Sequence, residues 1–181
     1  MASANGNAAG SAGPGGPLGP SGSPNLQGAS DRPGTIMQGD RRKAYRPISE
    51  ELRRSAFEAG LEAYARGDFF EAHELLEPAW MGTSNVAERS LYQGIIKLAA
   101  GYVHAVRGNP IGMARNLEGA RRYLTTSEQL DPGCATSAGI DLAALVAAVD
   151  DRLAAVRALP AIVGTNPAAL LDLAADAPPV R

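Results

Sequence analysis

Two turn signals of the same kind divide the middle of the chain into stretches with helical spacing. Gly67 is followed by Asp68, and Gly108 is followed by Asn109 and Pro110. Glycine favours the left-handed position just beyond a helix, whereas Asp and Asn cap the start of the next helix. On both sides of each signal, apolar residues recur at intervals of three and four, the period of a helix with one buried face. A chain punctuated in this way is expected to fold into consecutive antiparallel helices joined by short turns.

The remaining punctuation predicts where the other helices begin and end. Ser49 and Asn85 are good helix caps, and Asn166 with Pro167 indicates a short last helix. Pro78 lies inside the second helix and predicts a kink or an end within about one turn. No segment shows the period-two alternation of a strand. The sequence therefore predicts an all-α fold, a compact bundle of antiparallel helical hairpins, with helices over about 50–66, 68–80, 86–107, 110–125, 140–159 and 167–175.

The two ends of the chain are expected to lie outside this bundle. Residues 1–45 are dominated by Gly, Pro, Ser and Ala and have few large apolar side chains. Such a segment buries too little surface to offset the entropy lost on ordering, so we expect a disordered tail. The helical domain is then predicted to span residues 46–160. Residues 161–181 form a C-terminal tail that contains the short last helix.

The composition argues against several classes of protein. The net charge of −2 and a pI near 5.7 lack the basic surplus of a general nucleic-acid binder. No apolar run approaches the roughly 20 residues of a membrane span, so no membrane insertion is expected. Cys134 is the single cysteine, which rules out an intramolecular disulfide and fits a reducing, cytoplasmic setting.

A short pattern of small and apolar residues occurs twice along the chain. Gly60, Gly67, Ala72, Leu76 and Ala79 have the same relative spacing as a set 41 residues later, which is Gly101, Gly108, Met113, Leu117 and Ala120. Each set describes two helices crossing at small residues and joined by a glycine turn, as in a tetratricopeptide hairpin. A true array needs about three units, so the pattern indicates shared hairpin geometry and leaves an interaction module as one functional hypothesis.

The only two histidines define the candidate site. His73, Glu77 and Trp80 stand at positions i, i+4 and i+7 and therefore share one face of a helix. His104 lies late in the following helix. Because the early part of one helix meets the late part of the next in an antiparallel pair, we expect His73 and His104 to converge with Glu77 between them.

This arrangement suggests a metal or acid–base site. Two imidazoles and one carboxylate can bind a divalent transition metal and leave positions open for water or substrate. Gln93 and Lys97 share a stripe with His104 and could polarise a substrate. On this hypothesis the protein is a metal-dependent hydrolase. His73, Glu77 and His104 would be metal ligands or catalytic groups, and Trp80, Gln93 and Lys97 would line the pocket.

The same residues also fit a purely structural hypothesis. His73 and Glu77 can form a simple hydrogen bond on one helix face, and Trp80 is an expected core anchor in a chain with few aromatic residues. His104 can cap a nearby carbonyl group. The protein would then be a non-catalytic helical interaction module whose partner is a small molecule or another protein. Its Ala-rich helices could also pair between copies in a homo-oligomer.

These residues resemble the signature of a prokaryotic family catalogued as domain of unknown function 309. The signature is His-x-x-x-Glu-x-x-Trp followed by a distant His, and it falls on His73, Glu77, Trp80 and His104. The stretches 67–77, 92–100 and 107–109 also resemble that family, and the similarity covers about residues 53–125. It implies a small all-helical domain with a shared polar pocket and no established activity. Pro78 departs from the family pattern, in which an ordinary helix former is more common.

Overall fold

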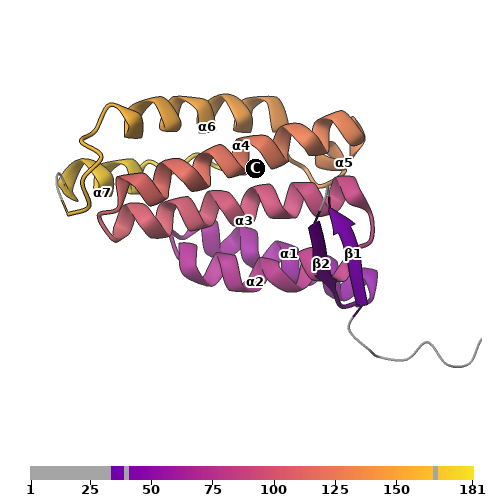
Figure 1. Cartoon of the computed structure of the whole chain (residues 1–181). Helices are drawn as coiled ribbons and strands as arrows, with labels where there is room; N and C mark the ends of the chain where they lie inside the picture. The colour runs from indigo at the N-terminus through magenta and orange to yellow at the C-terminus, as the bar shows by residue number, and fades with distance from the viewer. Residues whose placement is uncertain (1–33, 39–40, 165–166) are drawn as a thin grey trace, which may run out of the picture. The chain divides into compact units, whose positions relative to one another are not determined.

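The computed structural model describes residues 34–38, 41–164 and 167–181 (Figure 1). The expected disorder of residues 1–33 lies outside the described residues. Within the described part, the chain forms two short strands and seven helices, which confirms the all-helical bundle. The elements are β1 (Gly34–Gln38), β2 (Arg41–Tyr45), α1 (Glu50–Ala65), α2 (Phe69–Gly82), α3 (Val86–Val106), α4 (Pro110–Leu130), α5 (Pro132–Ser137), α6 (Leu142–Arg157) and α7 (Pro167–Ala175).

Helix α3 is the centre of the bundle. The helices α1 to α4 pack in sequence order as antiparallel neighbours, α6 packs on α4, and α7 packs on α3 (Figure 1). Helix α3 therefore contacts α2, α4, α5 and α7. Most of its side chains are buried, including Leu91, Ile95, Leu98 and Tyr102. A helix that is apolar on nearly all sides can be stable only when other elements surround it.

The two predicted glycine turns have the same backbone geometry. Gly67 has φ 82° and Gly108 has φ 67°, the left-handed region that favours glycine. The following amide closes each turn: that of Asp68 donates to Ala63 at 3.0 Å, and that of Asn109 donates to His104 at 2.9 Å. The Asn109 side chain caps α4 as expected. The Asp68 side chain forms no cap hydrogen bond, so only the second turn has the predicted side-chain cap.

The repeated spacing corresponds to a repeated helix crossing. A methyl group on Gly60 would lie 2.5 Å from Cγ of Leu76, and one on Gly101 would lie 3.3 Å from Cδ2 of Leu117. Real Cβ atoms essentially never come as close as the first distance. The hairpins α1–α2 and α3–α4 thus share a crossing in which a glycine of the first helix receives a leucine of the second.

The structure corrects the predicted boundary of the N-terminal tail. Residues 34–45 belong to an antiparallel hairpin in which Gly34 pairs with Tyr45, although the sequence predicted no strands. The amide of Arg46, just after β2, donates to the carbonyl of Met81 at 2.9 Å. The hairpin buries little apolar surface and is held by hydrogen bonds to the α2–α3 region. Its strands therefore lack the alternating apolar pattern from which strands are recognised.

The end of α4 and the segment after it differ from the prediction, whereas the end of α2 and the last helix agree with it. Helix α4 runs to Leu130, beyond the expected end near residue 125, and the predicted turn after it contains the short helix α5, capped by Asp131. Helix α2 continues to Gly82, one turn past Pro78, in agreement with the expected end. The short last helix is present as α7, with Leu170 and Ala174 buried. Within the described ranges, none of the helices is both long enough and apolar enough to cross a membrane.

The crossing at Gly60 leads to a stability prediction. Gly60→Ala should lower the free energy of unfolding by about 1–3 kcal/mol, because the added methyl group overlaps Leu76. Gly119→Ala is the matched control, since a methyl group there makes ordinary contact with Lys97 at 3.4 Å. It should be neutral or stabilising, as alanine favours helix. Urea denaturation followed by circular dichroism measures both, and equal effects would contradict the packing account.

Candidate functional site

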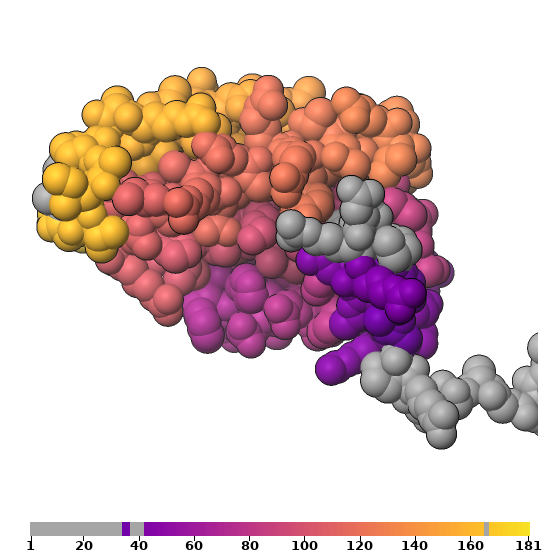
Figure 2. All heavy atoms as spheres, viewed as in Figure 1, coloured from indigo at the N-terminus to yellow at the C-terminus, as the bar shows by residue number. Residues whose placement is uncertain are grey.

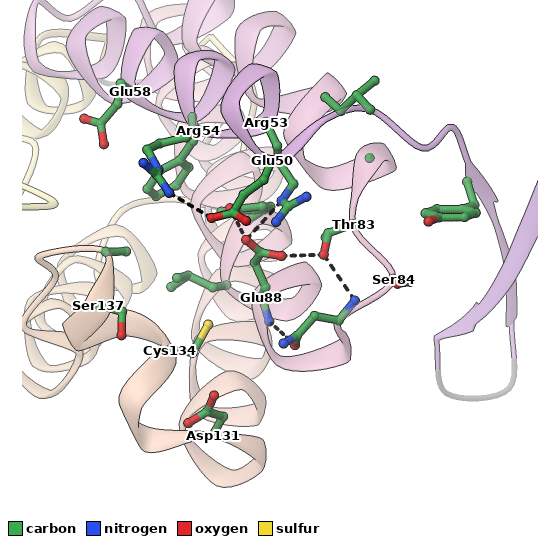
Figure 3. Close-up of a pocket in the computed structure, with 18 of the residues that line it drawn as sticks. Glu50, Arg53, Arg54, Glu58, Thr83, Ser84, Glu88, Asp131, Cys134 and Ser137 are labelled. Atoms are coloured by element: carbon green, nitrogen blue, oxygen red, sulfur yellow. Dashed lines mark hydrogen bonds and ion pairs between the residues drawn. The ribbon is translucent and has the colours of Figure 1, made fainter.

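A polar pocket of about 600 Å³ lies at the end of the bundle that carries the α2–α3 loop (Figure 3). Helix α1, the loop after α2, the first turns of α3 and helix α5 all contribute to its wall. Because the lining residues come from distant parts of the chain, no local motif marks this pocket in the sequence. The residues that define its chemistry are Arg53, Thr83, Glu88, Tyr92 and Cys134.

Glu88 is the hub of the pocket. Its Oε1 accepts hydrogen bonds from Nε of Arg53 at 3.1 Å and from the hydroxyl of Tyr92 at 2.6 Å. Its Oε2 accepts a hydrogen bond from the hydroxyl of Thr83. Hydrogen bonds to an ionised carboxylate are stronger than those between neutral groups. One side chain in the first turn of α3 thus ties together α1, the α2–α3 loop and α3 (Figure 3).

The ionisable groups around Glu88 have shifted pKa values. Burial raises the pKa of Tyr92 well above its ordinary range, and the hydrogen bond to Glu88 adds to this effect. Burial alone would lower the pKa of Arg53, but its pairing with Glu88 outweighs burial and raises it. Burial also raises the pKa of the Cys134 thiol, and the negative charges of Glu88 and Asp131 act in the same direction. At neutral pH this cysteine is therefore a thiol and not a nucleophilic thiolate.

Further charged pairs line the pocket. Arg54 donates to Glu50 at 2.8 Å, and Nη2 of Arg181 donates to Oε1 of Glu58 at 2.8 Å. The hydrogen bond from Arg181 lowers the pKa of Glu58. Each arginine that lines the pocket thus has a carboxylate partner. Asp131 adds a fourth carboxylate, which leaves the wall with one excess negative charge.

Arg89, in the first turn of α3, is fully buried beside this pocket, and its side chain reaches the C-terminal end of α2. Its exposed fraction is 0%, and its guanidinium donates to the carbonyls of Trp80 at 2.8 Å, Thr83 at 3.3 Å and Ala44 at 2.8 Å. It also stacks on the Trp80 ring, 4.5 Å from the ring centroid. Burial lowers its pKa, and within the described part of the chain no carboxylate forms an ion pair with it. Arginine remains charged nonetheless, and the unpaired carbonyls at a helix C-terminus favour a cation.

The residues predicted from the sequence as one site lie in different surroundings. Nδ1 of His73 is 3.2 Å from Oε1 of Glu74. The side chain of Glu77 forms no hydrogen bond or ion pair with any residue that the structure describes. Nδ1 of His104 is 3.2 Å from Nδ2 of Asn109, and its ring lies against Gly112 of α4. Burial lowers the pKa of His104, and the nearby charges of Arg107 and Lys97 lower it further.

The register of α2 against α3 is consistent with these different surroundings. Two ring contacts fix that register: Phe69 on Tyr102 at 5.0 Å, and Trp80 on Arg89 at 4.5 Å. In this register His73 faces a part of α3 that is about two turns, or roughly 10 Å, from His104. The described residues contain no group of three or more His, Cys, Asp or Glu side chains that could hold a metal ion. His73, Glu77 and His104 therefore do not form such a group.

The remaining predicted pocket residues also have other contacts. Nζ of Lys97 is 3.3 Å from Oδ1 of Asn116, so this side chain faces α4. Gln93 is buried, and its Oε1 has no partner among the described residues; the same is true of Nε1 of Trp80. Trp80 itself is covered by Arg89. Sequence spacing identified Trp80 as an anchor but gave no sign of Arg89, because a buried arginine looks like any other charged residue in a helix.

The contacts of Arg89 lead to a second prediction. Arg89→Met should lower the free energy of unfolding by about 2–4 kcal/mol, since it leaves three carbonyls without their donor. Arg89→Lys should recover only part of this loss, because an ammonium group lacks the planar fork that reaches several carbonyls. Urea denaturation measures the loss, and hydrogen exchange of residues 41–46 reports release of the hairpin. Arg122→Met, at an exposed position of α4, is the control, and an equal loss there would contradict the assignment.

Comparison with known proteins finds one family model that matches part of the chain. Residues 57–116 match the family model described as Domain of unknown function (DUF309). Neither the curated proteins nor the solved structures give a match to the chain. The matched stretch runs from the middle of α1 into α4 and contains both glycine turns and the whole His-x-x-x-Glu-x-x-Trp motif. The resemblance indicated by that motif is therefore confirmed, over residues 57–116, for a domain that is helical and has no assigned function.

Proposed function

We propose that this protein is a non-catalytic helical binding module and that the pocket around Glu88 holds a small polar ligand. The volume of about 600 Å³ lies within the roughly 300–1,000 Å³ of small-molecule sites. Several elements converge on the pocket, and both hydrogen-bond donors and acceptors line its wall (Figure 3). Such a convergence of polar groups in a concave surface is the usual form of a binding site.

The shifted pKa values of the groups in the pocket favour a binding role over a catalytic one. A general acid or base works best when its pKa lies near the working pH. In the pocket, the pKa of Tyr92 and of the Cys134 thiol is raised, and the pKa of Glu58 is lowered. Each shift moves the pKa of the group further from pH 7. These groups therefore keep one charge state near pH 7 and serve as fixed hydrogen-bonding partners.

We further propose that the predicted catalytic set is structural. The contacts of Trp80 with Arg89 and of His104 with Asn109 support this role, because both contacts join consecutive elements of the bundle. His73 and Glu77 then belong to the half-buried face of α2. On this proposal Gln93 and Lys97 pack between helices and do not polarise a substrate.

The charge of the pocket favours a ligand that carries a positive charge. Its three arginines are paired with Glu50, Glu58 and Glu88, and Asp131 is an additional carboxylate in the pocket wall. A small amine can donate to a carboxylate and also replace water at the hydroxyl groups of the wall. An anionic ligand would instead have to separate an existing arginine–carboxylate pair.

Thermal-shift and calorimetric titrations test this proposal with putrescine and ethanolamine as probes and acetate as the anionic comparison. The amines should raise the melting temperature, because a ligand that binds only the folded state stabilises it. Asp131→Asn should abolish the shift while keeping the cap of α5, since asparagine caps helices equally well. Asp172→Asn, at an exposed position of α7, should keep the shift. Equal shifts with acetate, or none with either amine, would refute the proposed ligand class.

The state of Cys134 is open to a separate test. Its reaction with an aromatic disulfide reagent at pH 8 should be slower than that of free cysteine, because the raised pKa leaves less thiolate. Asp131→Asn should increase the rate by about twofold, since it removes one negative charge that disfavours the thiolate. Asp172→Asn should leave the rate unchanged. A rate at or above that of free cysteine would show an activated thiol and contradict a non-catalytic pocket.

A further inference from the structure

Exposed apolar side chains gather at the end of the bundle away from the polar pocket. Phe70 at the start of α2 is 61% exposed, and Val106 at the end of α3 is 55% exposed. Together with Val103 they border a shallow groove of about 440 Å³. The exposed Val163 lies nearby, because the amide of Gly164 donates to the carbonyl of Gly108 at 3.0 Å. We call Phe70, Val103, Val106 and Val163 the end patch; Figure 2 shows the loop after α6 against the α3–α4 turn in this region.

The exposure of Phe70 is unusual for a chain with so few aromatic residues. The protein contains three phenylalanines, and the other two, Phe57 and Phe69, are buried in the core. Covering a side chain of this size typically stabilises a protein by about 1.5–3 kcal/mol. An exposed phenylalanine beside an apolar groove is therefore typical of a surface that another protein covers.

The end patch can receive a copy of itself. A twofold interface uses the same surface on both partners, so that surface needs both a projection and a hollow. Phe70 provides the projection, and the groove beside Val103 and Val106 provides the hollow. From this pairing we infer that two copies of the chain associate through their end patches, with Phe70 of each copy in the groove of the other.

The charges at the rim of the groove also match across a twofold axis. Asp68 and Glu71 line the α2 side, and Arg107 lines the α3 side. Arg107 forms no ion pair with any described residue. The acids pair only with Arg66, at 3.5 Å and in an exposed position, where such pairs contribute little. In the dimer the acids of one copy meet Arg107 of the other, while the polar pocket at the far end of each copy stays open. The inference is thus independent of the proposed ligand.

Light scattering on the full chain over a concentration series measures the association. The wild-type protein should reach twice the chain mass of 18.7 kDa. Phe70→Asp should reduce the mass to that of one chain, while its circular dichroism stays like that of wild type because Phe70 is exposed. Leu52→Asp is the matched control, since Leu52 is 57% exposed but lies on α1 outside the end patch. It should retain the dimer.

A charge exchange tests the pairing across the axis. Arg107→Glu alone should weaken the dimer by about tenfold, because it places like charges together. Adding Glu71→Arg to that variant should restore the wild-type dissociation constant. A wild-type mass of one chain at every concentration would overturn the inference and leave the end patch to a partner of a different kind. A dimer that survives Phe70→Asp would overturn it as well.

Discussion

The buried guanidinium of Arg89 holds together the parts of this structure that helix packing alone does not join. It donates to carbonyls at the end of α2, in the α2–α3 loop and in β2, and it stacks on the Trp80 ring. A buried charge is normally costly unless its hydrogen bonds are made. Here three carbonyl oxygens accept hydrogen bonds from Nη1 and Nη2, and the negative end of the α2 dipole favours the charge, whereas Nε has no partner among the described residues. This side chain therefore links the hairpin and the α2–α3 loop to the bundle, together with the hydrogen bond from the Arg46 amide to Met81.

The polar pocket depends on the same arrangement. Thr83, which donates to Glu88, lies in the loop whose carbonyl also accepts from Arg89. Arg89 and Glu88 are neighbours in the first turn of α3, so one turn of helix directs a cation inward to α2 and an anion outward to the pocket. The buried cation organises the backbone, and the half-buried anion organises the pocket wall.

Polar and apolar features occupy opposite ends of the described bundle. The Glu88 pocket lies beside the α2–α3 loop, and the end patch lies beside the two glycine turns. Both glycine turns leave tight connections at one end, which expose the first residues of α2 and the last residues of α3. Because of this separation, the proposed ligand site and the proposed self-association surface share no residues.

Local sequence signals determined much of the helical order. Gly67, Gly108 and Asn109 predicted the turns, because left-handed backbone and helix caps are local requirements that single residues meet. The repeated glycine–leucine spacing predicted the shared crossing of the two hairpins. In contrast, the sequence predicted disorder where the β-hairpin lies. Contacts with distant residues hold the hairpin in place, and its own sequence lacks the apolar pattern that would have indicated strands. Only the tertiary structure decided which polar residues meet. The register of α2 on α3 places His73 opposite a part of α3 that is about two turns from His104, and spacing along one helix does not encode that register. The same register places Arg89 beneath Trp80 and opens the Glu88 pocket between elements that are far apart in the sequence.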